Sequence, residues 1–152
     1  ITNGHIWMIE QGARLFDELI VAVGVNPAKH TTFSLAERLK MTRDCVGGLK
    51  SVRVQSFENE FLVHFTTSVH AQYILRGIRN SADYDFERGM RHINEDLHDE
   101  VTTVFLMPPR EISEVSSSLV KGLIGPRGWR RIVKQYVPAP VYAMLLAKHK
   151  HD

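Results

Sequence analysis

The chain has 152 residues, of which 43% are hydrophobic and 24% are charged. This length and composition predict a single domain that spans residues 1–152. The formal net charge is only +2, which argues against a protein that wraps nucleic acid and against a polybasic membrane anchor.

Cysteine content and hydropathy indicate the compartment in which we expect the protein. The single cysteine, Cys45, cannot form an intramolecular disulfide, which favours a reducing compartment. No run of about 18 apolar residues is present, so the sequence predicts no membrane-spanning helix. We therefore expect a cytoplasmic protein that binds neither nucleic acid nor membranes.

The first predicted elements are a helix, a strand and a second helix. Apolar residues at helical spacing predict a helix from about residue 5 to residue 16. The continuously apolar, β-branched run at 19–25 is typical of a strand covered on both faces. Ser34 stands three residues before Glu37, which is a capping box at the start of a helix that runs toward Val46.

The alternation continues through the rest of the chain. Strands are predicted at 52–56, 73–75 and 102–107, and helices are predicted around 61–69, 86–97, 116–124 and 140–149. Strands that alternate with helices imply right-handed βαβ crossovers, so we predict an α/β fold with a parallel sheet. In such sheets ligands bind at the carboxyl ends of the strands.

The segment Thr2-Asn3-Gly4-His5 is a candidate anion site at the start of the first helix. Free backbone N–H groups and the helix dipole favour an anion there, glycine permits close approach, and histidine can donate to a phosphate oxygen. The alternative is that Thr2 or Asn3 only caps the helix and that His5 is a surface residue.

Two further segments suit anions. Arg76-Gly77-Ile78-Arg79 follows a strand and brings two guanidinium groups together, although both arginines could instead pair with Asp83, Asp85 or Glu87. Ser116-Ser117-Ser118 opens a helix and offers hydroxyl and N–H donors, although helix capping alone would also explain it. Three such segments together indicate a polyphosphate ligand.

These segments also carry a family resemblance. Thr2-Asn3-Gly4-His5 looks like the (H/T)xGH motif of the nucleotidyltransferase superfamily, and the arginine and serine segments resemble the bacterial phosphopantetheine adenylyltransferases. Segments 26–29, 33–38, 83–87, 103–108 and 137–138 follow in that family's order and spacing. The resemblance implies adenylyl transfer from ATP to 4′-phosphopantetheine, giving dephospho-coenzyme A and pyrophosphate, without a covalent enzyme intermediate.

The resemblance implies roles for individual residues. His5 would stabilise the transition state at the α-phosphate, Lys29 and Arg76 would hold the acceptor phosphate, and Leu62 would contact the pantetheine arm. Besides His5, the residues expected at ATP are Gly77, Ile78, Arg79, Glu87, Ile112, Ser113, Glu114, Val115, Ser116, Ser117 and Ser118. Mg²⁺ would accompany ATP, held by phosphates and water, so no residue is predicted as a metal ligand. The family is usually a homohexamer.

The chain departs from the family's usual sequence at several positions. Asn80 stands where an alanine is common, Phe86 where a tyrosine is common, and Glu114 where an aromatic residue is common. In the segment 125–129, where the family usually carries a glycine-rich turn with aspartate, Trp129 is interpreted as a packing residue. The alternatives are another (H/T)xGH adenylyl- or cytidylyltransferase, acting for instance on nicotinate mononucleotide or glycerol phosphate, or a non-catalytic nucleotide-binding module.

The resemblance also bears on the start of the chain. Family members begin with a strand and a Pro-Gly-(Ser/Thr)-Phe-Asp-Pro turn, neither of which precedes Ile1. We expect roughly a dozen further residues upstream, including a hydroxyl residue that faces the phosphates. The expected fold is thus a Rossmann-like doubly wound parallel sheet whose first strand is apparently missing, with a gap between the strands at Leu19 and Tyr73.

Overall fold

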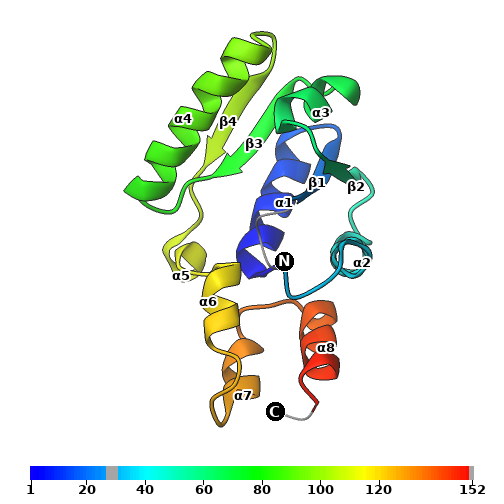
Figure 1. The fold of residues 1–152 in the computed structure, drawn as a ribbon, viewed down its shortest axis with the longest axis vertical. Helices are drawn as coiled ribbons and strands as arrows, with labels where there is room; N and C mark the ends of the chain where they lie inside the picture. The colour runs from blue at the N-terminus through cyan, green and yellow to red at the C-terminus, as the bar shows by residue number, and fades with distance from the viewer. Residues whose placement is uncertain (27–30, 151–152) are drawn as a thin grey trace.

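A computed structural model describes residues 1–26 and 31–150. The strands are β1 (Leu19–Val25), β2 (Val52–Glu58), β3 (Tyr73–Gly77) and β4 (Thr102–Leu106). The helices are α1 (Asn3–Leu15), α2 (Leu35–Val46), α3 (Leu62–Ser68), α4 (Ser81–Leu97), α5 (Arg110–Ser113), α6 (Ser117–Gly122), α7 (Trp129–Val133) and α8 (Ala139–Lys148). The predicted alternation of strands and helices in an α/β fold is confirmed (Figure 1).

Local sequence signals explain where several helices begin. Ser34 accepts a hydrogen bond from the Glu37 backbone N–H at 3.2 Å, and the Glu37 carboxylate accepts one from the Ser34 N–H at 2.7 Å, so the predicted capping box opens α2. The short helices α5 and α7 were not predicted. α7 starts after Gly128, whose φ of +87° is in the left-handed region that favours glycine.

The four described strands form two separate parallel pairs. β1 pairs with β2 from Leu19 opposite Val52, and β3 pairs with β4 from Tyr73 opposite Thr102. Among the described residues no hydrogen-bonded ladder joins β1 to β3. The gap predicted between these two strands is therefore present. A groove of about 930 Å³ occupies it, lined along one side by 19–22 of β1 and along the other by 73–76 of β3.

Helix α1 joins the two pairs of strands. A Cβ atom on Gly12 would lie 2.9 Å from Leu75 Cδ2 of β3 and 3.0 Å from Leu19 Cδ2 of β1, so glycine allows α1 to approach both. The rings of Phe16 and Tyr73 also pack with centroids 5.3 Å apart. α1 thus fixes the position of one pair of strands relative to the other.

The main apolar core lies where α2 meets the C-terminal helices. Its buried residues are Phe33, Met41, Val120, Trp129, Val133, Val137, Val141 and Leu145. Trp129 is only 3% exposed, which confirms its interpretation as a packing residue. This core supports the start of α1, because the Asn3 N–H donates to the Tyr136 carbonyl at 2.9 Å.

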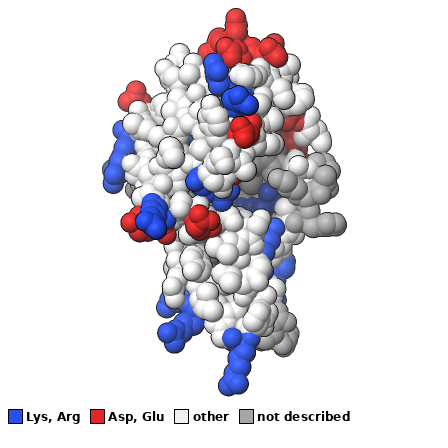
Figure 2. All heavy atoms as spheres, turned by 90° about the vertical axis from the view of Figure 1, so that its left-hand side faces the viewer, with Lys and Arg blue, Asp and Glu red and all other residues white. Residues whose placement is uncertain are grey.

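Charge is distributed unevenly over the surface. Figure 2 shows acidic side chains gathered at one end of the molecule and lysine and arginine side chains at the other, with both signs between them. Within the part of the chain that the structure describes, no helix is both long and apolar enough to cross a membrane.

Candidate active site

His5 lies in the first turn of α1, and Thr2 holds its ring. The Thr2 backbone N–H donates to His5 Nδ1 at 3.1 Å, and Thr2 Oγ1 lies 2.8 Å from the same nitrogen. Thr2 itself is 1% exposed. The Asn3 side chain adds a second anchor, because its Nδ2 donates to the Gln135 carbonyl at 3.0 Å. The imidazole is therefore fixed before any ligand arrives.

The surroundings of His5 keep its ring uncharged. The side chain lies beside the cavity with part of its surface exposed, and loss of solvent around the ring lowers its pKa from 6.5 to about 4, helped by the positive charges of Arg79 and Arg76. At neutral pH His5 is consequently a neutral hydrogen-bond donor and acceptor rather than a cation.

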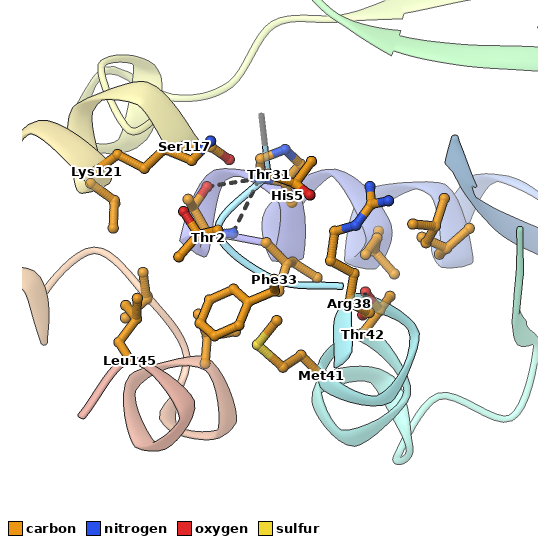
Figure 3. Close-up of a pocket in the computed structure, with 18 of the residues that line it drawn as sticks. Thr2, His5, Thr31, Phe33, Arg38, Met41, Thr42, Ser117, Lys121 and Leu145 are labelled. Carbon is orange, nitrogen blue, oxygen red and sulfur yellow. Dashed lines mark hydrogen bonds between the residues drawn. The ribbon is translucent and has the colours of Figure 1, made fainter. Parts of the chain in front are cut away.

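A cavity of about 420 Å³ adjoins His5 (Figure 3). Its polar lining comes from four elements or loops that are far apart in the sequence, namely Thr2 and His5, Thr31 and Thr32, Arg38 and Thr42, and Ser117 and Lys121. The opposite wall is apolar and includes Phe33, Met41 and Leu145. The cavity thus places donors on one side and the C-terminal core on the other.

The two predicted arginines are paired with acids of α4. Arg76 donates to Glu87 through Nε at 2.9 Å and Nη2 at 2.5 Å. Arg79 donates to Asp83 through Nε at 2.7 Å and Nη2 at 3.1 Å, and this hydrogen bond holds the pKa of Asp83 below its usual value. Each guanidinium keeps further N–H groups beyond these two, so the pairing that the sequence left open is present and donors remain for a phosphate.

The 112–118 segment, which contains the predicted serines, lies against the Thr2–His5 segment at Gly4. A Cβ on Gly4 would lie 3.0 Å from the Val115 carbonyl oxygen and 3.9 Å from that of Ile112. Because the neighbours are backbone atoms, only glycine fits without displacing them. The structure therefore brings the Thr2–His5 segment and the 112–118 segment together, as a shared phosphate site requires.

The three serines differ in their surroundings. Ser116 accepts from the Leu119 N–H at 3.1 Å and caps α6, which is the alternative that the sequence left open for this residue. Ser117 lines the cavity beside His5, and Ser118 is exposed. Ser113 donates to the Arg110 carbonyl at 3.0 Å. Glu114 is close enough to Arg79 to contribute to that arginine's raised pKa.

The residues predicted to bind the acceptor lie apart from this cavity. Leu62 and Arg76 both line the larger groove between β1 and β3. Lys29 falls outside the described residues. The groove and the cavity adjoin, since Met8, Ile9, Val21 and Ala22 line both.

Two residues predicted at ATP, Gly77 and Ile78, lie at and just after the end of β3. A Cβ atom on Gly77 would lie 3.3 Å from Met8 Sδ, and Ile78 is 8% exposed.

Arg38 and Lys121 also line the cavity, although the sequence analysis did not single them out. Arg38 Nη1 donates to the Gly24 carbonyl at 3.1 Å, so this side chain also ties α2 to the end of β1. Lys121 lies one helical turn after Ser117 on α6, and that spacing was the available sequence signal.

Comparison with known proteins identifies the family. A family model described as cytidylyltransferase-like matches residues 1–123. A phosphopantetheine adenylyltransferase from Chromobacterium violaceum is 58% identical over 152 residues, which is 100% of this chain and 93% of that protein. The one from Neisseria meningitidis serogroup C is 55% identical over 99% of this chain and 89% of that protein.

A third relative is more distant. The phosphopantetheine adenylyltransferase from Lacticaseibacillus paracasei is 37% identical over 97% of this chain and 86% of that protein. The chain belongs to the phosphopantetheine adenylyltransferase family. This confirms the resemblance drawn from the Thr2–His5, arginine and serine segments, and it extends the likeness to this family over the whole chain.

Proposed function

We propose that this protein transfers the adenylyl group of ATP to 4′-phosphopantetheine, giving dephospho-coenzyme A and pyrophosphate. The observation that carries the proposal is the contact of the Thr2–His5 segment with the 112–118 segment at Gly4, with Arg79 and Arg76 close enough to lower the pKa of His5. The names of the relatives support this choice of acceptor and nucleotide.

The reaction needs no protein nucleophile. An oxygen of the acceptor phosphate attacks the α-phosphorus of ATP, and the bond from that phosphorus to the oxygen bridging to the β-phosphate breaks. Pyrophosphate leaves with the bonding electron pair. The only cysteine agrees with a mechanism of this kind, because burial raises the pKa of the Cys45 thiol and keeps it protonated.

The residues of the site divide the remaining tasks. His5 donates a hydrogen bond to the α-phosphate as charge develops there, which favours the transition state over the bound substrates. The nucleotide is bound by Arg79 with Gly77 and Ile78, and by Ser117 with its neighbours in 112–118. Arg76, Lys29 and Leu62 bind the acceptor. Glu87 orients Arg76 through the two hydrogen bonds between them.

Mg²⁺ fits this proposal as a partner of ATP. Within the described residues no group of three or more histidine, cysteine, aspartate or glutamate side chains is placed to hold a metal ion. An ion that arrives with ATP is coordinated mainly by phosphate oxygens and water, and it would neutralise charge on the triphosphate. The proposed site therefore needs no cluster of carboxylates to hold the ion.

We also propose that the protein is a cytoplasmic homohexamer. Phe86, Ile93 and Leu97 lie on one side of α4 and are 63%, 45% and 40% exposed, and such an apolar stripe is typical of a surface that another protein covers. Equilibrium sedimentation at micromolar concentration tests the assembly, and a monomer under those conditions would contradict it.

Pyrophosphate release tests the activity. The purified protein with ATP and Mg²⁺ should release pyrophosphate when 4′-phosphopantetheine is added, and the nucleotide product should be dephospho-coenzyme A by mass. Release with nicotinate mononucleotide or glycerol phosphate instead would identify another acceptor. ATP binding with no release for any acceptor would identify a nucleotide-binding module and overturn the proposal.

A further inference from the structure

The contact between Thr2 and His5 determines which ring nitrogen carries the proton. A backbone N–H can only donate, and the Thr2 N–H points at His5 Nδ1 from 3.1 Å. This contact therefore favours the tautomer in which Nδ1 offers its lone pair. The Thr2 hydroxyl, 2.8 Å from the same atom, then has to donate its own hydrogen, so one nitrogen receives two donors from one residue.

The same geometry disfavours the other forms of the ring. A proton on Nδ1, whether in the second neutral tautomer or in the imidazolium ion, would face the Thr2 N–H and break that hydrogen bond. The loss of solvent and the positive charges that lower the pKa of His5 act in the same direction. The favoured neutral ring carries its hydrogen on Nε2, and the contacts to Thr2 drawn in Figure 3 involve the other ring nitrogen.

We propose that Thr2 is a positioning residue, which holds His5 in the tautomer that donates from Nε2 to the α-phosphate of ATP. The effect on catalysis rests on the proposed adenylyl transfer, whereas the tautomer itself does not. Without the second partner at Nδ1, part of the His5 population would carry its hydrogen on the wrong nitrogen and present a lone pair to the phosphate.

Several features suit Thr2 to this role. It is 1% exposed, so water does not compete for Nδ1. Its backbone is held because the next residue, Asn3, donates to the Tyr136 and Gln135 carbonyls. Threonine is β-branched and has few side-chain rotamers, so its hydroxyl stays directed at the ring.

Two substitutions at this position separate hydrogen bonding from packing. Thr2→Val keeps the shape and the backbone N–H but removes the hydroxyl, and Thr2→Ser keeps both donors. Thr66→Val is the matched control, because it removes another buried hydroxyl, which donates to the Leu62 carbonyl at 2.8 Å on a different helix. Thermal unfolding shows whether each variant is folded.

The first measurement is the ¹⁵N NMR spectrum of the His5 ring, assigned by its loss in His5→Gln. The full chain at neutral pH should show an unprotonated Nδ1 and a protonated Nε2. Thr2→Val should show a mixture of tautomers, while Thr2→Ser and Thr66→Val should keep the original one. A protonated Nδ1 in the unaltered protein, or an unchanged tautomer in Thr2→Val, would overturn the proposal.

The second measurement is steady-state adenylyl transfer. Thr2→Val should lose about 10- to 100-fold in kcat, as is typical when the partner that orients a functional histidine is removed. Its KM for ATP should change little, and Thr2→Ser should recover most of the rate. If the unaltered protein has the Nε2–H tautomer but releases no pyrophosphate, the proposed function fails while the tautomer assignment stands. A normal kcat in Thr2→Val would refute the positioning role.

Discussion

Two parts of the site are prepared for a phosphate in different ways. At the start of α1, His5 is neutral and is held by donors from Thr2, with its second nitrogen directed elsewhere. At the end of β3, Arg76 and Arg79 are charged and already bound by carboxylates. The residue proposed to act in the transition state is thus held in place by neutral hydrogen bonds, whereas the residues proposed to bind substrate share their charge with acids.

Replacing His5 is expected to have the largest effect. His5→Ala should lower kcat by roughly 10² to 10³, the usual loss of one donor aimed at a transition state, with little change in ATP affinity. Rapid-quench turnover and calorimetric ATP titration measure the two quantities. An unchanged kcat would show that His5 does not act in the transition state, so the start of α1 and the end of β3 would no longer differ in role.

Replacing the arginines should affect binding more than turnover. Arg76→Ala should weaken 4′-phosphopantetheine and Arg79→Ala should weaken ATP, each by about 10- to 100-fold, because hydrogen bonds to charged groups are lost. Titration of both ligands into both variants measures this. Equal loss of both ligands in each variant would show that the arginines do not divide the substrates.

The same variants should differ in stability. The Glu87 side chain is 10% exposed and that of Asp83 is 23% exposed, so removing Arg76 leaves the more buried carboxylate without its partner. We expect a greater loss of unfolding free energy in urea for Arg76→Ala than for Arg79→Ala. Glu87→Gln combined with Arg76→Ala should restore part of that loss, and no restoration would argue against this cause.

A smaller effect is expected at Gly4, where the Thr2–His5 segment touches the 112–118 segment. Gly4→Ala should cost about 1–3 kcal/mol of unfolding free energy and raise the KM for ATP, because its Cβ would press on the Val115 carbonyl. Gly89→Ala is the control: its Cβ meets nothing within 4 Å, and helix propensity predicts a gain of about 0.5–1 kcal/mol. Equal effects in the two variants would contradict the close contact.

The last effect concerns pH and is confined to acidic conditions. The pKa of His5 falls from 6.5 to about 4 on folding, so between these values the unfolded chain binds more protons than the folded one. As the pH falls from 6.5 toward 4, protonation of His5 in the unfolded chain therefore lowers the free energy of unfolding. Above pH 6.5 His5 causes no such loss. Urea unfolding across this range should show a shallower loss in His5→Gln than in the unaltered chain, and parallel curves would place the pKa of His5 near its ordinary value.

Most of the fold could be predicted because its signals are local. The apolar run at 19–25, the capping box at Ser34 and the breaks at proline and glycine locate β1, α2 and the end of β4. α5 and α7 were missed because helices this short have no periodicity to detect, and each follows a proline or a left-handed glycine instead. The gap between β1 and β3 was predicted from the family's topology, not from these local signals.

The candidate site could be predicted only in part. Residue types identified the three candidate anion segments, and the carboxyl ends of strands indicated that they would meet. The sequence could not decide between ligand and acid as the partner of Arg76, because the guanidinium has donors enough for both. Nor could it show the ring of His5 turned onto Thr2, which depends on side-chain rotation and on the burial of Thr2 by distant residues.

In the described residues, the groove between β1 and β3 leaves one edge of each strand without a hydrogen-bonded neighbour. An edge strand ordinarily pairs with an added strand on one side, but here two parallel edges face each other across one groove. A single extended peptide seated there would hydrogen bond on both sides and join both sheets into one ladder.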